Sequence, residues 1–218
     1  RWWTSGKGRP TIVLLHGFAA DRRLNWQLTG WYEALSGAGY RVLAFDARGH
    51  GQSDKPSDIE AYRPEGIAAD AVRLLDHLSI RKASLFGYSM GGPIAQLIWR
   101  RHPERVRGLA LCATAPYFLT SREEKLGFIG LSGLATLARL TPTQARQWLT
   151  EQFYLQRKSS EWEPWAIQEA SLHDWRMVLE AGRAIGKFNS REWIADIDVP
   201  TSVLITMRDR VVPVRRQV

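Results

Sequence analysis

The residues best suited to chemistry surround Ser89. The string Gly87-Tyr88-Ser89-Met90-Gly91 follows the short apolar run 83–86 and precedes a helical pattern. Small residues on both sides let a strand turn sharply into a helix, because any side chain there would clash where the two elements approach each other. The turn presents the serine hydroxyl above the sheet edge, beside the free N–H groups that begin the helix. The pattern therefore predicts a nucleophilic serine; a glycine-rich turn that only packs is the alternative.

Alternating strands and helices must position this serine. Apolar runs predict strands at 11–15, 41–45, 83–86, 106–113 and 201–205, and amphipathic or capped segments predict helices at 25–35, 64–78 and 92–102. This alternation predicts an α/β fold, with a mostly parallel sheet and helices on both faces. The lone Cys112, in the fourth of these strands, fits a buried apolar position better than a nucleophile.

The segment between the last two strands has a different pattern. No strand signal appears there, whereas Thr120 with Glu123 resembles a capping box and Thr141-Pro142 resembles a helix start. We expect an inserted all-helical cap at 116–199, over a core made of 1–115 and 200–218. Tryptophans are frequent in this segment, and two of them, Trp148 and Trp175, are candidates for lining a substrate pocket; packing between cap helices is the alternative for each.

Bulk properties exclude several function classes. A chain of 218 residues fits one α/β domain with an insertion, and no apolar run is long enough to span a membrane. The formal charge of +8 comes from scattered arginines without a basic and aromatic groove, so we expect no nucleic-acid partner. No Cys/His set has zinc spacing, and we expect no metal or organic cofactor. We expect a cytoplasmic protein without stable membrane insertion, although a lost leader stays open; the oligomeric state is undetermined.

The chain resembles the α/β-hydrolase superfamily, in the branch with a helical cap between the sixth and seventh strands. Four ordered motifs carry the resemblance: His16-Gly17-Phe18, the Asp46 to Asp54 loop, the 87–92 turn, and the stretch from Thr206 to Pro213. The resemblance implies that Ser89 is the nucleophile and that Asp209 orients a catalytic histidine. It also implies that the backbone N–H groups of Phe18 and Met90 form the oxyanion hole. Phe18 and Tyr88 are further pocket candidates, and Arg48 and Asp54 are expected to make structural hydrogen bonds.

The chain departs from the family pattern at the catalytic histidine. The expected order is serine, acid, histidine, yet no histidine follows Asp209 in the nine remaining residues. We expect none of the histidines present to replace it; they are His16, His50, His77, His102 and His173. We therefore expect a chain truncated at both ends, with an exposed apolar sheet edge, and the catalytic histidine in the longer parent protein.

The resemblance implies a serine hydrolase that cleaves an ester or related acyl bond through an acyl-enzyme. The fragment alone is expected to be inactive, and the tryptophan-rich cap favours a small, apolar acyl substrate. The turn at 87–92 also resembles that of perhydrolases, C–C bond hydrolases and enol-lactonases. A serine at position 89 argues against haloalkane dehalogenase and epoxide hydrolase chemistry. A non-catalytic ligand receptor or signalling protein on the same fold is the rival from another class.

Overall fold

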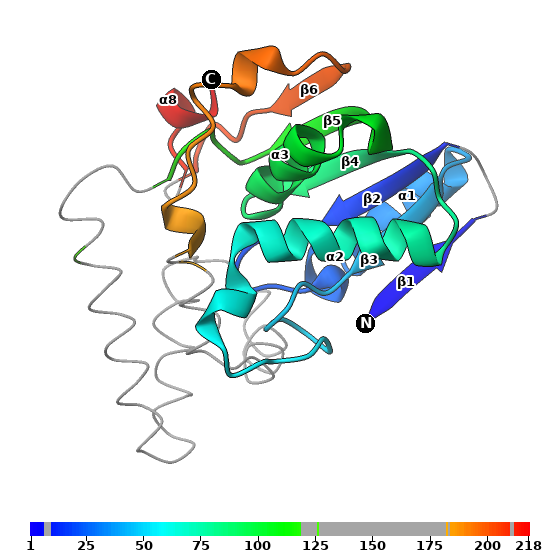
Figure 1. The fold of residues 1–218 in the computed structure, drawn as a ribbon. Helices are drawn as coiled ribbons and strands as arrows, with labels where there is room; N and C mark the ends of the chain where they lie inside the picture. Colours follow the sequence, from blue (N-terminus) through cyan, green and yellow to red (C-terminus); the bar gives the residue numbers. More distant parts are fainter. Residues whose placement is uncertain (7–9, 119–125, 127–181, 183, 210–211) are drawn as a thin grey trace.

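A computed structural model describes residues 1–6, 10–118, 126, 182, 184–209 and 212–218 (Figure 1). Its strands form one sheet in the order β1-β3-β2-β4-β5-β6. Strands β2 to β6 are all parallel, and β1 pairs with β3 in the antiparallel direction, which confirms the predicted mostly parallel sheet. The strands are β1 (Trp2–Ser5), β2 (Thr11–Leu15), β3 (Arg41–Phe45), β4 (Ala83–Tyr88), β5 (Val106–Cys112) and β6 (Thr201–Leu204).

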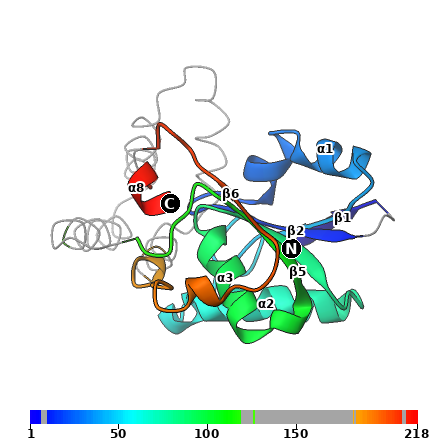
Figure 2. The ribbon, with the colours of Figure 1, turned by 90° about the horizontal axis from the view of Figure 1, so that it is seen from above.

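Helices cover both faces of the sheet, as predicted. Figure 2 shows α1 on one face and α2 and α3 on the other. The α-helices are α1 (Trp31–Gly37), α2 (Pro64–His77), α3 (Gly91–Arg101) and α8 (Val214–Gln217). Shorter turns are the π-helix η1 (Arg23–Gln27) and the 3₁₀ helices η2 (Ile59–Tyr62), η3 (Pro103–Arg105) and η5 (Ile194–Asp196).

Each central strand contributes to two apolar layers, because neighbouring side chains on a strand point to opposite faces. Leu85 of β4 lies in the layer under α2 and α3, with Ile67 and Ile94, whereas the next residue, Phe86, lies in the layer that contains Trp26. The two layers fix the sheet between the helices. They hold the carboxyl ends of β2, β4 and β5 in place, where the predicted site residues follow.

The predicted helix at 25–35 is wrong in its extent. The chain instead forms η1, turns at 28–30, and starts α1 at Trp31. Gly30 has φ +78°, a left-handed conformation that a residue with a side chain would resist. Nothing lies within 4 Å of the position that its Cβ would take. Its apolar neighbours continue the helical periodicity across the break, which is why the pattern predicted one element.

The predicted cap at 116–199 lies mostly outside the described residues, and its domain boundaries stay a prediction. Its two described ends lie side by side: Tyr117 bridges to Asn189, and the Ser190 N–H donates to the Pro116 carbonyl at 2.8 Å. Among the described strands, β6 forms one edge of the sheet, and its Val203 is 51% exposed. The expected exposure of an apolar edge is therefore confirmed.

Candidate active site

Ser89 occupies a strained turn between β4 and α3. Its φ of +49° lies in the left-handed region, which is uncommon for a residue with a side chain and is found where the surrounding structure enforces it. The Ser89 N–H donates to the Cys112 carbonyl at 2.9 Å. The Ser89 carbonyl accepts from the Gly92 N–H at 2.9 Å and from the Thr114 hydroxyl at 2.8 Å. Three hydrogen bonds thus hold the serine backbone in this conformation.

The glycines around Ser89 are required by contact distances. A Cβ on Gly87 would lie 2.4 Å from the Gly91 carbonyl oxygen, and one on Gly91 would lie 2.1 Å from the Leu15 carbonyl oxygen. A Cβ on Gly92 would meet the Thr114 hydroxyl oxygen at 2.1 Å. The predicted reason for the flanking glycines, close approach of strand and helix, is confirmed.

The turn after β2 lies beside this serine turn. Gly17 is so close to Tyr88 that an added Cβ would be 3.0 Å from its ring, and the Gly17 N–H donates to Asn25 Oδ1 at 2.7 Å. Phe18 follows in this turn, and Met90, at 1% exposure, immediately precedes α3. The two peptide N–H groups predicted for the oxyanion hole therefore belong to neighbouring turns at the carboxyl edge of the sheet; their role stays a prediction.

The described pocket candidates are only partly buried. Phe18 packs at the edge of the core under α2 and α3, with its ring centroid 6.3 Å from that of His50. Tyr88 lies on the opposite face of the sheet, 6.4 Å from the Trp26 ring. The other two, Trp148 and Trp175, lie outside the described residues.

His16 joins two loops at the same edge. Its Nε2 accepts from the Ala47 N–H at 2.9 Å, and its Nδ1 lies 2.8 Å from the Gly17 carbonyl oxygen, to which it donates in this tautomer. Burial lowers the pKa of His16, and the Gly17 hydrogen bond only partly opposes this effect. Both ring nitrogens are thus engaged with the backbone, so the side chain has a structural role at this edge.

Asp209 follows β6 and lies on the same sheet edge. Its Oδ2 accepts from the Thr206 hydroxyl at 3.0 Å, and its Oδ1 accepts from the Val212 N–H at 2.9 Å. Burial, and after it the charge of Asp209, raises the pKa of the Cys112 thiol at the end of β5. Because Cys112 also binds the Ser89 N–H, the predicted nucleophile and acid flank the same residue.

The spacing of the strands agrees with this arrangement. β4 and β6 are separated only by β5, so the strands that carry Ser89 and Asp209 are about 10 Å apart. The predicted roles of both residues remain predictions.

The remaining histidines have other surroundings. His50 contacts the His16 ring at 5.2 Å between centroids, and His77 contacts Trp2 at 6.3 Å in the last turn of α2. His102 lies beyond the far end of α3, 3.8 Å from Glu104. His173 lies outside the described residues. The identity of the general base therefore stays a prediction.

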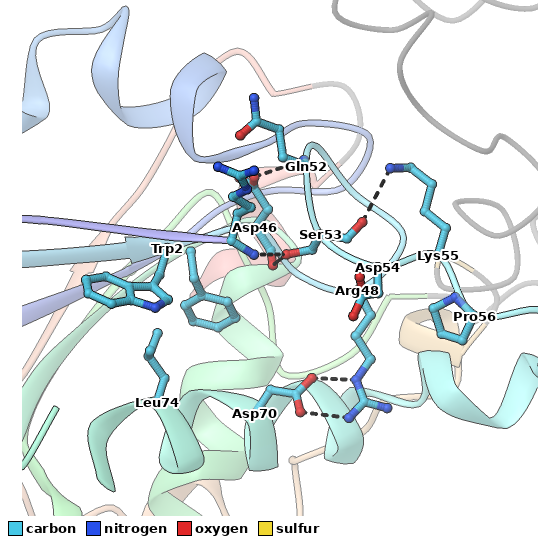
Figure 3. A pocket seen from close by; sticks show the side chains of 12 residues that line it. Trp2, Asp46, Arg48, Gln52, Ser53, Asp54, Lys55, Pro56, Asp70 and Leu74 are labelled. Atoms are coloured by element: carbon cyan, nitrogen blue, oxygen red, sulfur yellow. Dashed lines mark hydrogen bonds and ion pairs between the residues drawn. The ribbon is translucent and has the colours of Figure 1, made fainter. Parts of the chain in front are cut away.

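The loop that begins at Asp46 is held by hydrogen bonds, as expected. Arg48 pairs with Asp70 of α2 through two hydrogen bonds (Figure 3). Asp46 is buried and accepts from the backbone N–H groups of Arg22 and Gln52. The Asp54 backbone carbonyl accepts from the Gly49 N–H at 2.9 Å. A surface cleft of about 870 Å³ opens over this loop, and neither Ser89 nor Asp209 lines it.

Sequence reasoning missed two residues that support the site, Thr114 and Gln217. The Thr114 hydroxyl holds the Ser89 carbonyl, and Gln217 binds the loop that carries Asp209. Neither residue lies in a local motif, so only the tertiary structure reveals them.

The described residues contain no group of three or more His, Cys, Asp or Glu side chains arranged to hold a metal ion. Among them there is also no helix of the length and apolar character needed to cross a membrane.

Comparison with known proteins connects this geometry to a family. The chain is 30% identical over 216 residues to the AB hydrolase superfamily protein YisY of Bacillus subtilis, covering 95% of this chain and 77% of that protein. It is 38% identical over 106 residues to epoxide hydrolase B of Mycobacterium tuberculosis, covering 46% of this chain and 27% of that enzyme. Its fold matches the enol-lactonase from Burkholderia xenovorans with a TM-score of 0.78 and 27% identity, covering all of this chain and 81% of that one.

The match to the family as a whole extends over nearly the entire sequence. Residues 10–218 fit the pattern described as the alpha/beta hydrolase fold. Together with the parallel sheet and the serine turn at its carboxyl edge, this match shows that the chain belongs to the α/β-hydrolase family.

Proposed function

We propose that this protein is a serine hydrolase that cleaves an ester or related acyl bond of a small, apolar substrate through an acyl-enzyme. The observation that carries the proposal is Ser89 itself, held at φ +49° between a strand and a helix whose close approach requires glycine on both sides. Backbone strain of this kind clusters at functional sites. The hydrolases among its relatives support hydrolysis as the reaction class.

In the proposed reaction Ser89 Oγ attacks the acyl carbon while a histidine removes its proton. The bond from that carbon to the leaving alcohol breaks, and the same proton passes to the leaving oxygen. Water then attacks the acyl-enzyme, gives its proton to the histidine, and Ser89 Oγ recovers a proton as the acid is released. Asp209 orients the histidine and stabilises its charged form.

The oxyanion that forms in each step needs donors placed before the reaction begins. We assign them to the peptide N–H groups of Met90 and Phe18. Each such donor contributes about 2.7–4 kcal/mol to lowering the barrier. Because both are backbone groups, substitutions at these positions alter the shape of the pocket more than the charge stabilisation.

Epoxide opening is the second candidate, since several relatives are epoxide hydrolases. Serine is poorly suited to it. Attack by Ser89 on an epoxide carbon would leave an ether, which offers no carbonyl for water to attack. Attack on an acyl carbon leaves an ester, which water hydrolyses. The residue at position 89 therefore favours acyl chemistry.

A fluorophosphonate probe tests the proposal on the intact natural protein. We expect covalent labelling at Ser89, mapped by mass spectrometry, and hydrolysis of short p-nitrophenyl esters. Ser89→Ala should lose both, and Asp209→Asn should lower kcat by about 10⁴-fold, as removal of the orienting acid does in other triads. A folded wild-type protein that neither reacts with the probe nor hydrolyses esters would overturn the proposal and favour a ligand receptor.

A further inference from the structure

The side chain of Gln217 closes the loop that carries Asp209. Gln217 lies at the end of α8 and is 6% exposed. Its Oε1 accepts from the Thr206 N–H at 2.9 Å, while its Nε2 donates to the Val212 carbonyl at 2.6 Å and to the Thr206 carbonyl at 3.2 Å. One buried amide thus ties together the two ends of the loop from 206 to 212.

Gln217 binds two residues that also hold the Asp209 carboxylate. The Thr206 hydroxyl donates to Oδ2, and the Val212 N–H donates to Oδ1. The orientation of the carboxylate therefore depends on where Thr206 and Val212 are held. A buried amide with both its donor and its acceptor engaged holds them more rigidly than an exposed one, since water does not compete.

The helix that carries Gln217, α8, contains only four residues, but contacts of its neighbour Arg216 hold it in place. The neighbouring Arg216 is 9% exposed and donates to the Phe118 carbonyl at 2.6 Å. Its guanidinium also lies 5.8 Å from the centre of the Tyr117 ring. These contacts join α8 to the chain that leaves β5, at Tyr117 and Phe118.

We propose that Gln217 is a positioning residue for the acid of the triad: through Thr206 and Val212 it sets the direction of the Asp209 carboxylate. This inference rests on the proposed role of Asp209. It adds a residue from outside the serine, acid and oxyanion motifs. Catalysis depends on such placement, because a misplacement of about 1 Å can reduce the rate about 10²-fold.

Gln217→Met tests the inference, because methionine has a similar length and no amide. In the intact natural protein we expect kcat for ester hydrolysis to fall between about tenfold and 10²-fold, with KM within about twofold of wild type. A turned carboxylate stabilises the protonated histidine less, so the acidic limb of the kcat/KM profile should move to lower pH. The matched control is Arg215→Met on the exposed side of α8, which should change none of these quantities.

Alkylation of Cys112 gives a readout that does not require catalysis. The Asp209 charge contributes to the raised pKa of this thiol. If the carboxylate turns away in Gln217→Met, the thiol pKa should fall, as measured from the pH dependence of iodoacetamide reaction; Cys112→Ser identifies the signal. Thermal unfolding shows whether the variant is folded. If it is not, Gln217→Asn, a neutral amide that is one methylene too short to reach both Thr206 and Val212, takes its place and should give the same changes in smaller measure.

The outcomes separate the two proposals. Loss of kcat and a lowered Cys112 pKa support the positioning role. An unchanged thiol pKa with unchanged kcat, in a folded variant, overturns it. If wild type is not labelled by fluorophosphonate yet the thiol pKa falls in Gln217→Met, the positioning of Asp209 holds and the proposed hydrolase function fails.

Discussion

Replacing Gly91 by alanine tests whether the contact between α3 and β2 determines the position of Ser89. The new Cβ would lie 2.1 Å from the Leu15 carbonyl oxygen and 2.7 Å from its carbonyl carbon. Both atoms belong to the backbone of a buried central strand, which cannot rotate away as a side chain would. The helix must therefore move by about 1.3 Å to reach an ordinary contact of 3.4 Å.

The magnitude follows from two opposed effects. Overpacking that displaces backbone costs about 3 kcal/mol, at the upper end of its usual range, while alanine in a helix gains up to about 1 kcal/mol over glycine. We expect a net loss of about 2–3 kcal/mol and a fall in Tm of about 4–12 °C. Gly37→Ala is the matched control: this glycine is also helical, nothing lies within 4 Å of its Cβ position, and the same change should raise Tm by a few degrees.

Thermal unfolding followed by circular dichroism measures both variants against wild type. The ester assay is run in parallel, since movement of α3 also moves Ser89, two residues before Gly91. The reasoning fails if Gly91→Ala melts within about 1 °C of wild type. It also fails if Gly37→Ala is destabilised as much as Gly91→Ala, because the loss would then reflect glycine replacement in general.

Three further predictions concern stability. Burial lowers the pKa of His16 below its unfolded value of 6.5, so the stability that its neutral form contributes is complete above that pH and is lost as the pH falls below it. The free energy of unfolding in urea, measured between pH 5 and 8, should show this loss at up to about 1.4 kcal/mol per pH unit. His16→Gln should remove it. An equal slope of unfolding free energy against pH in both proteins would contradict the assignment. Arg48→Lys should lower the free energy of unfolding, measured in urea, by about 1 kcal/mol, because lysine cannot form the double hydrogen bond to Asp70. No measurable loss would show that the pair is merely a surface contact. Ser190→Ala should cost about 1–3 kcal/mol, because its hydroxyl donates to the fully buried Gln96 Oε1 at 2.6 Å; a neutral result would mean that water replaces the donor.

Local patterns were sufficient to predict the serine turn. The glycines at 87 and 91 indicate a close approach of backbone atoms, because side chains do not fit where a strand and a helix nearly touch. The same applies to the strands, whose short apolar runs agree with β2 to β5 within three residues at each end. These features depend on neighbours in sequence, so sequence alone conveys them.

Contacts between distant residues could not be predicted in this way. Thr114 reaches the Ser89 carbonyl from 25 positions away, and it does so only because β5 lies beside β4. Gln217 reaches Thr206 across 11 positions, and it lies beyond the end of the Thr206 to Pro213 motif. The break at Gly30 was missed for the opposite reason, since its apolar neighbours maintain helical periodicity on both sides.

The end of β5 explains how a serine and an acid on different strands keep a defined spacing. Ala113 has φ +49°, a left-handed conformation like that of Ser89, and its N–H donates to the Leu204 carbonyl of β6 at 3.1 Å. The residues on either side bind Ser89: the Cys112 carbonyl accepts from its N–H, and the Thr114 hydroxyl donates to its carbonyl. One tight turn is therefore hydrogen-bonded to the serine on one side and to the strand leading to Asp209 on the other. Because these bonds are mostly between backbone groups, they depend little on which side chains the turn carries.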